Sequence, residues 1–266
     1  MALPVYTPYQ WNPNLTGYYS LLVDGQDFEV MNAEEPWSLT ATDNDAITFQ
    51  VRPGDQYWWD AADGDGAQRS EIEDRVSTPD GTPIEVSYAF SLAPGALNTA
   101  SWLVLGQLHP GDTFTAPVVV GPPFEIALDG EKLQINIVAT DASGKPYVET
   151  LYTSPTNIVR GQFYDMDIKA VFDPSGNGRL VVICDGVTLV DYTGSLGYSN
   201  QTGVVWKEGI YEGPGASGTT TATFENLNIT TGSAVAFPDP SAFIPAPVLS
   251  VASIAAQSNE IGRAHV

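Results

Sequence analysis

The chain has 266 residues, and its 10 Lys and Arg stand against 32 Asp and Glu, which gives a formal net charge of −22. So acidic a protein repels the phosphates of nucleic acids and the anionic surface of membranes, and we expect neither as a partner. A site for an anionic ligand would have to gather the few basic residues in one place. The length suits one large domain or two small ones.

Short runs rich in Val, Ile, Thr, Tyr and Phe recur along the chain, separated by Gly, Pro, Asn and Asp, and helical periodicity is nearly absent. Strands joined without helices pack as two antiparallel sheets, so we predict an all-β sandwich of the jelly-roll type. The clearest hairpin spans residues 179–192 around Asp185 and Gly186. The predicted strands are residues 46–52, 68–76, 82–92, 101–108, 124–128, 132–139, 147–152, 163–172, 178–185, 187–192, 203–211 and 220–228.

The chain divides into three parts by composition. We assign residues 1–232 to the sandwich and residues 233–259, rich in Pro, Ala and Ser, to a linker or tail. Residues 260–266 resemble a translated sequencing adapter and are excluded from the fold reasoning. On this interpretation a C-terminal module is missing after the linker.

The cysteine content and the N-terminal residues do not indicate a cellular compartment. The single cysteine, Cys184, excludes an intramolecular disulfide, and its apolar neighbours predict a buried side chain. No apolar stretch is long enough to span a membrane. The first residues lack a basic region followed by an apolar segment, so no signal peptide is visible.

The predicted strand at residues 68–76 carries an unusual concentration of charge. Because side chains alternate between the two faces of a sheet, one face receives two arginines and two carboxylates: Arg69, Glu71, Glu73 and Arg75. Such a row suits an anion-binding groove, in which arginine holds a substrate carboxylate and glutamate holds the arginine. A solvated outer face with cross-strand ion pairs is the alternative.

The second motif contains the chain's one histidine outside the adapter-like end. On a strand, Gln107 and His109 share a face while Leu108 points into the core. The pair therefore places an amide and an imidazole side by side at the rim of a sheet. A histidine with a purely structural role is the ordinary alternative.

The third motif lies near the end of the predicted sandwich. Lys207, Gly209 and Tyr211 share one strand face, and the glycine leaves room for a ligand to cross the strand. Lysine and tyrosine beside such a gap suit an electrostatic partner and a proton carrier. An edge strand with an aromatic rim is the alternative.

Together the three motifs resemble those of the jelly-roll polysaccharide lyases, which include alginate, glucuronan and heparin-lyase-like enzymes with a concanavalin A-like fold. Those enzymes carry, in this order, an Arg-Ser/Ala-Glu, a Gln-x-His and a Lys-x-Gly-x-Tyr strand on one concave sheet. The corresponding segments here are Arg69-Ser70-Glu71, Gln107-Leu108-His109 and Lys207-Glu208-Gly209-Ile210-Tyr211. Alginate lyases usually have arginine where this chain has Glu73, and the third motif is closer to the glucuronan and heparin-lyase-like branch.

The resemblance implies an extracellular, monomeric, endo-acting enzyme that cleaves an anionic polysaccharide containing uronic acid by β-elimination, with no required cofactor. Arg69 and Gln107 would neutralise the substrate carboxylate. His109 would be the base or a further carboxylate partner, and Tyr211 the acid or both acid and base. Lys207 would favour a transient tyrosinate. The residues expected to bind substrate are Glu71, which also orients Arg69, Glu73, Arg75, Trp59 and Trp206.

Two other functions fit the same sequence. A non-catalytic carbohydrate-binding module would use tryptophans as stacking platforms, namely Trp58, Trp59, Trp102 and Trp206. A laminarinase-type hydrolase shares the sandwich fold and uses a Glu-x-Asp-x-Glu strand. However, Arg75 stands where its second catalytic carboxylate would be.

The segment before the first motif contains spaced carboxylates. Asp60, Asp63 and Asp65 are candidate ligands of a structural calcium ion, since calcium prefers oxygen ligands. A solvated Asp-Gly turn is the alternative interpretation of the same residues.

Overall fold

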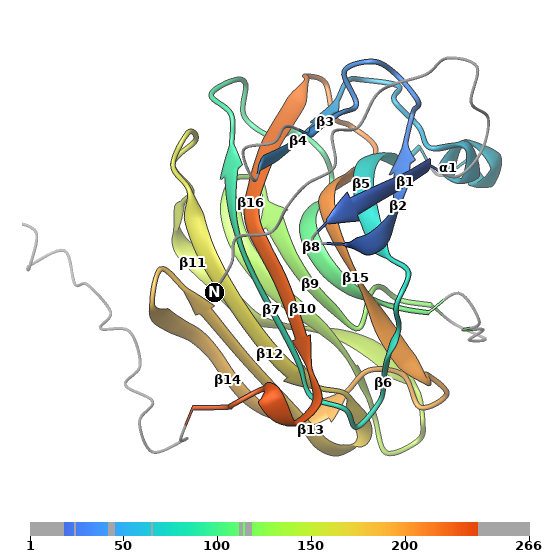
Figure 1. Cartoon of the computed structure of the whole chain (residues 1–266), viewed down its shortest axis with the longest axis vertical. Coiled ribbons are helices and arrows are strands. Elements are labelled where there is room, and N and C mark those ends of the chain that lie inside the picture. Colours follow the sequence, from blue (N-terminus) through green and yellow to red (C-terminus); the bar gives the residue numbers. More distant parts are fainter. Residues whose placement is uncertain are drawn as a thin grey trace, which may run out of the picture.

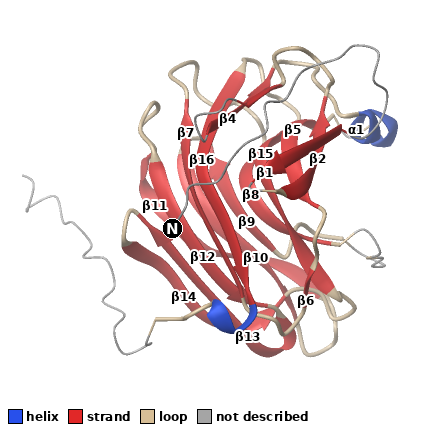
Figure 2. Cartoon of the chain, viewed as in Figure 1, coloured by secondary structure: helices blue, strands red, loops and turns tan. Residues whose placement is uncertain are grey.

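The computed structural model describes residues 19–23, 25–41, 46–64, 66–111, 114 and 119–238. Its strands form two antiparallel sheets packed face to face (Figure 1), and helix is confined to two short segments (Figure 2). The predicted jelly-roll sandwich is confirmed. Asp65, most of the linker and the adapter-like end lie outside the described residues. No helix within the described ranges is long and apolar enough to cross a membrane.

The larger sheet has nine strands in the order β1-β2-β5-β15-β8-β9-β10-β11, and β6 pairs with β15. Their bounds are β1 Tyr19–Val23, β2 Gln26–Asn32, β5 Gln68–Asp74, β6 Thr78–Pro79, β8 Leu103–Pro110, β9 Phe124–Asp129, β10 Lys132–Thr140, β11 Pro146–Asn157 and β15 Gly203–Glu212.

The smaller sheet has seven strands in the order β14-β13-β12-β7-β16-β4-β3. Their bounds are β3 Leu39–Ala41, β4 Ala46–Val51, β7 Ile84–Leu92, β12 Tyr164–Val171, β13 Asp173–Cys184, β14 Val187–Leu196 and β16 Thr220–Thr231. The predicted hairpin joins β13 to β14, and both of its turn residues, Asp185 and Gly186, have positive φ.

A short helix, α1 (Trp58–Asp63), lies beside β2 and β5 at one end of the larger sheet (Figure 1), and a 3-10 turn, η1 (Gly232–Ala234), follows β16. Helix α1 stops at Gly64, whose φ of 70° is in the left-handed region. The solvated Asp-Gly turn expected here is correct in that Asp63 and Gly64 are exposed, and wrong in that they end a helix. The segment is helical and buries the carboxylate of Asp60, whose partner comes from β5.

The core fills the space between the sheets, and Trp206 belongs to it. Its side chain is fully buried, and its ring centroid lies 5.3 Å from that of Tyr88. A Cβ on Gly106 would lie 2.7 Å from the indole, so the glycine makes room for this ring. The prediction that Trp206 binds substrate is wrong, because its neighbour Lys207 takes the open face of the strand and Trp206 takes the core face.

The strand register aligns one row of side chains across the open face of the larger sheet. The row runs from β2 to β11 through directly paired positions. Its members, here called the cross-strand row, are Glu29, Glu73, Lys207, Gln107, Glu125, Asn136 and Thr150. The three sequence motifs consequently meet on the adjacent strands β5, β15 and β8.

Candidate active site

Two neighbouring cavities lie on the open face of the nine-stranded sheet. The first, about 600 Å³, is bordered by α1, β2, β5, β15 and β8, and basic and aromatic side chains line it. The second, about 350 Å³, extends from β15 and β8 over β9, β10 and β11. The five predicted catalytic residues all line one of them: Arg69, His109 and Lys207 the first, and Gln107 and Tyr211 the second.

Arg69 is held in place by two carboxylates. Its Nε and Nη2 donate to the two oxygens of Asp60 at 2.6 and 2.5 Å, and its Nη1 lies 3.4 Å from Oε2 of Glu71. Burial would lower the pKa of Arg69, but Glu71 and Asp60 outweigh burial and raise it, so the guanidinium stays charged. Both carboxylate oxygens of Asp60 bind Arg69, so Asp60 positions this cation. The prediction of Asp60 as a calcium ligand is therefore wrong.

Glu71 is fully buried beneath the site and connects two of the predicted catalytic residues. It accepts a hydrogen bond from Gln107 Nε2 at 2.8 Å in addition to the contact with Arg69. Burial raises the pKa of Glu71, while Arg69, Lys207 and Gln107 act against that rise. With no exposed surface Glu71 makes no contact with a polymer, so its prediction as a substrate-binding residue is wrong. It orients Arg69 and Gln107 instead.

His109 has the geometry of a neutral base. Its Nδ1 lies 2.8 Å from the backbone carbonyl oxygen of Pro110. A carbonyl only accepts, so Nδ1 carries the proton and Nε2 carries the lone pair. Burial, followed by the charge of Lys207, lowers the pKa of His109 to about 3. The imidazole is therefore uncharged at neutral pH.

Lys207 and Glu73 are directly paired across β15 and β5 and form a buried ion pair. Arg75, just beyond the end of β5, is exposed and pairs with Asp27 at 3.3 Å and Glu29 at 3.6 Å. All three predicted residues, Lys207, Glu73 and Arg75, line the first cavity. This cavity consequently has three of the chain's 10 Lys and Arg on its wall, together with the carboxylates of Glu29 and Glu73.

Tyr211 and Gly209 occupy the irregular end of β15. The pairing with β8 contains a bulge between Glu208 and Tyr211. Gly209 has a φ of 139°, and a Cβ there would lie 2.3 Å from the carbonyl oxygen of Ser70 on β5. The glycine is thus required by the close approach of two strands, which differs from the expected gap for a ligand. The Tyr211 ring packs against Trp102, with 4.6 Å between centroids.

The exposed tryptophans of α1 stand at the edge of the first cavity. Trp58 and Trp59 are 45% and 57% exposed, and both line it, as expected of sugar-stacking residues. Trp102 lines the second cavity. Among the described residues no group of three or more His, Cys, Asp or Glu has the arrangement of a metal site.

The fold and this site define a β-sandwich enzyme of the carbohydrate-active class, with its functional groups on one sheet face. A family model described as polysaccharide lyase matches residues 32–228. The chain belongs to this polysaccharide lyase family, and it is a polysaccharide lyase. The prediction of a jelly-roll polysaccharide lyase is confirmed.

Solved structures share the fold at low sequence identity. The endo-β-1,4-glucuronan lyase from Trichoderma reesei matches with a TM-score of 0.58 and 12% identity over 86% of this chain and 95% of that one. The alginate lyase AlgAT5 of polysaccharide lyase family 7 matches with a TM-score of 0.52 and 17% identity, over 74% of this chain and 84% of that one. The family-7 alginate lyase A1-II′ matches with a TM-score of 0.51 and 16% identity, over 73% of this chain and 83% of that one. A search of curated proteins finds no match.

Proposed function

We propose that this lyase cleaves a polysaccharide containing uronic acid, of the glucuronan or alginate kind, by β-elimination within the polymer chain. The observation that carries the proposal is the gathering of Arg69, Lys207 and a neutral His109 around one cavity of a protein with a net charge of −22. A carboxylate-bearing polymer is the ligand that would need such a gathering of cations, each of them held in place by carboxylate partners. The glucuronan and alginate lyases with the same fold support this substrate class.

The first requirement of the reaction is to make a weakly acidic proton removable. The proton on carbon 5 of a uronate becomes acidic when charge on the adjacent carboxylate is neutralised by strong hydrogen-bond donors. Arg69 has five N–H groups, of which Asp60 and Glu71 engage three. The others, with the second amide N–H of Gln107, are the donors we assign to the substrate carboxylate.

The second requirement is a base and an acid. Elimination breaks the C5–H and C4–O bonds, forms a double bond between C4 and C5, and protonates the departing oxygen. His109, which borders the first cavity, carries a lone pair on Nε2, and the hydroxyl of Tyr211, which borders the second, is the proton donor. Where proton and leaving group depart from the same side of the sugar ring, Tyr211 serves both steps.

Cleavage within the chain is supported by the shape of the site. The cross-strand row runs from β2 to β11, so it offers polar contacts to sugar units on both sides of the catalytic residues. We further propose that the enzyme acts as an extracellular monomer, since uronate polymers are extracellular materials. No step of the mechanism requires a metal ion.

Ultraviolet absorbance tests the proposal, because elimination leaves a conjugated double bond in the new sugar end and hydrolysis does not. The panel is glucuronan, polymannuronate, polyguluronate and heparin-type and hyaluronan-type chains. A rise with one polymer identifies the substrate class, and a fall in viscosity ahead of the absorbance supports endo cleavage. A flat trace on every polymer overturns the proposal.

A further inference from the structure

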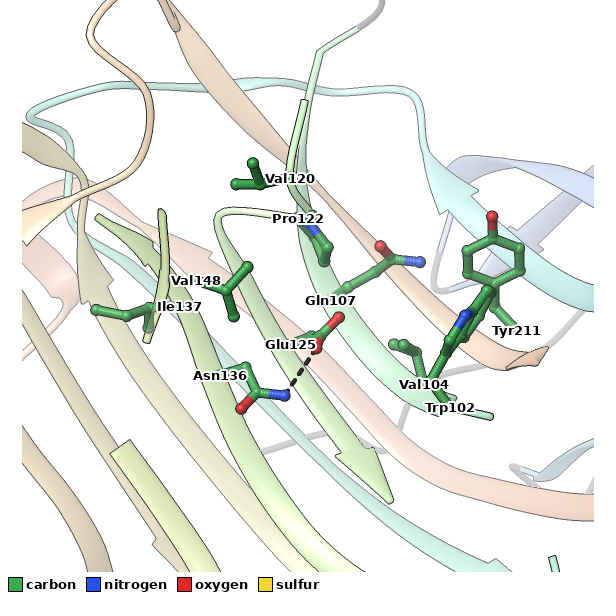
Figure 3. A pocket seen from close by; sticks show the side chains of 11 residues that line it. Trp102, Val104, Gln107, Val120, Pro122, Glu125, Asn136, Ile137, Val148 and Tyr211 are labelled. Atoms are coloured by element: carbon green, nitrogen blue, oxygen red, sulfur yellow. Dashed lines mark hydrogen bonds between the residues drawn. The ribbon is translucent and has the colours of Figure 1, made fainter. Parts of the chain in front are cut away.

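The second cavity differs in chemistry from the first. Figure 3 shows Trp102 and Tyr211 at one side of it and Val148 and Ile137 at the other, with polar side chains between them. The polar groups between the two sides are one carboxyl, from Glu125, and the amides of Gln107 and Asn136, while the aromatic side carries the Tyr211 hydroxyl and the Trp102 indole N–H. Its volume of about 350 Å³ lies in the range of small-molecule sites and suits a single sugar unit.

No lysine or arginine is among the described residues that line this second cavity. Along the cross-strand row the one cation is Lys207, and it stands on the other side of Gln107 from Glu125. A carboxylate placed beside Glu125 would be partly desolvated without an opposite charge, which is costly. Burial raises the pKa of Glu125, with Asn136 acting against the rise. Neither protonation state of Glu125 supplies a cation for a second uronate.

The rim of the cavity is apolar and exposed. Val148 on β11 is 48% exposed and Val120 is 37% exposed, and Pro122 lines the cavity with them. Apolar side chains that gather at a ligand site and remain exposed indicate that the ligand covers them. A 6-deoxy or O-acetylated sugar carries a methyl group, which would pack against these apolar side chains.

The polar groups of the cavity are held in fixed orientations. Asn136 Nδ2 donates to Glu125 Oε1 at 2.8 Å (Figure 3), and Thr150 Oγ1 donates to Asn136 Oδ1 at 2.7 Å. The indole of Trp102 rests on Gly213, where a Cβ would come within 2.5 Å of its Nε1. A fixed aromatic wall with a carboxyl and amides suits the C–H face and hydroxyls of a neutral pyranose.

We propose that this cavity is a subsite for an uncharged sugar bearing a methyl or acetyl group, next to the uronate held by Arg69. The preferred substrate is then a heteropolymer in which glucuronate-type units adjoin 6-deoxy or O-acetylated neutral sugars, rather than a pure polyuronate. This inference rests on the proposed function, because the position of the uronate beside Arg69 is part of that proposal.

The test compares kcat/KM on glucuronan and on a polymer that alternates glucuronate with a 6-deoxyhexose. The alternating polymer should be cleaved at least about 10-fold better, since one apolar group in a fitted pocket is worth about that factor. Val148→Arg places a cation at the rim and should reverse this preference. Val187→Arg, at a 45% exposed valine of the smaller sheet, is the matched control and should leave the ratio unchanged. Equal or better cleavage of glucuronan, with a ratio that Val148→Arg does not move, overturns the subsite.

Binding of a methyl 6-deoxyhexoside, followed by tryptophan fluorescence, separates this proposal from the proposed function. A saturable change that Val148→Arg removes and Val187→Arg keeps supports the subsite even when no polymer is cleaved. The absence of any saturable change overturns the subsite even when polyuronates are cleaved. The absence of new absorbance on every uronate polymer overturns the proposed function alone.

Discussion

The guanidinium carbon of Arg69 lies 4.0 Å from the centroid of the Tyr211 ring, and the two residues are directly paired positions of β5 and β15. Arginine stacks on aromatic faces because its flat cation meets the electron-rich ring. Asp60 holds the other edge of the guanidinium, so its position over the ring is fixed. In the proposed mechanism, negative charge that develops on the substrate carboxylate or on the Tyr211 oxygen would therefore meet one preorganised cation.

Replacing Tyr211 by phenylalanine should abolish turnover and leave binding intact. The substitution removes the hydroxyl and keeps the ring that packs on Arg69 and Trp102. Loss of a general acid or base costs about 10²- to 10⁴-fold in rate. The initial rate of absorbance increase measures this loss, and affinity electrophoresis in a polymer-containing gel measures binding.

Tyr147→Phe, at an exposed tyrosine of β11, is the control and should retain full activity. Tyr211→Phe with more than about a tenth of the original rate would exclude the tyrosine as the essential proton carrier.

His109 should remain neutral far below the usual pH for an imidazole. Burial and the charge of Lys207 hold the folded pKa at about 3, against an ordinary value of 6.5. Between those values the unfolded chain binds more protons than the folded protein, so stability falls as pH drops from about 6.5 toward 3. Between about pH 6.5 and 3, the melting temperature of His109→Gln should fall by less than that of the original chain.

The charge state of His109 is read directly from its proton NMR signals, which His109→Gln assigns by their disappearance. The signals should not shift between about pH 8 and 5. An inflection near pH 6.5 would mean that the imidazole is solvated and that the neutral-base assignment fails.

The alternation of side chains along a strand makes much of this site predictable from sequence. Alternation placed Gln107 and His109 on one face and Leu108 in the core, which the structure confirms, since Leu108 is fully buried and His109 lines the first cavity. The same rule assigns Trp206 to the core, because Lys207 beside it takes the open face of β15. Hydrophobic pattern and turn residues also predict β4, β5 and every strand from β7 to β16, although β11 extends five residues beyond the predicted end and β13 begins five residues before the predicted start.

Other features depend on contacts that no local pattern encodes. The predicted strands do not include β1, β2, β3 or β6. Strands β3 and β6 have only three and two residues, and the Asp24-Gly25 hairpin signal between the sequences of β1 and β2 was not used in the prediction. The partnership of Asp60 with Arg69 depends on how α1 docks against β5. One signal was present: a buried arginine needs a carboxylate partner, and an acidic run precedes Arg69.

Asp60→Asn should impair catalysis by releasing Arg69. The amide is nearly isosteric but carries no charge, so a buried guanidinium loses its main ion-pair partner, at a cost of about 3 kcal/mol in stability. We expect a fall in kcat larger than any rise in KM. Asp63→Asn, at an exposed residue of the same helix, is the control. Chelation of divalent cations should leave activity unchanged, and a loss restored by calcium would favour the calcium interpretation.

Gly209→Ala should destabilise the protein and displace the catalytic strands. The new Cβ would lie 2.3 Å from Ser70 O and 2.7 Å from Glu71 Cα, so the backbones of β15 and β5 must separate. Its positive φ adds strain for any residue with a Cβ. The expected change is a loss of at least about 2 kcal/mol in denaturant unfolding, together with loss of activity. Gly95→Ala, with open space around the added atom, should be neutral. Equal behaviour of the two variants would show that the bulge tolerates a side chain.

Glu208 should make the protein less stable as pH rises. Its side chain is fully buried on the core face of β15, and Trp206 Nε1 lies 3.3 Å from one of its oxygens. Burial raises the pKa of Glu208 to about 8, against an ordinary value of 4.5. Between those values the folded protein binds more protons than the unfolded chain, so stability falls as pH increases from about 4.5 to 8.

Glu208→Gln keeps the shape and the acceptor but does not ionise, so it should remove this slope. The gain near neutral pH should be about 2–3 kcal/mol, while at pH 4 the two proteins should be nearly equal. Thermal unfolding from about pH 4 to 8 measures both, with Glu149→Gln on β11 as the partly exposed control. Parallel curves for the original chain and Glu208→Gln would mean that the carboxyl ionises within the folded core at no cost, which its surroundings of Trp206 and Tyr88 oppose.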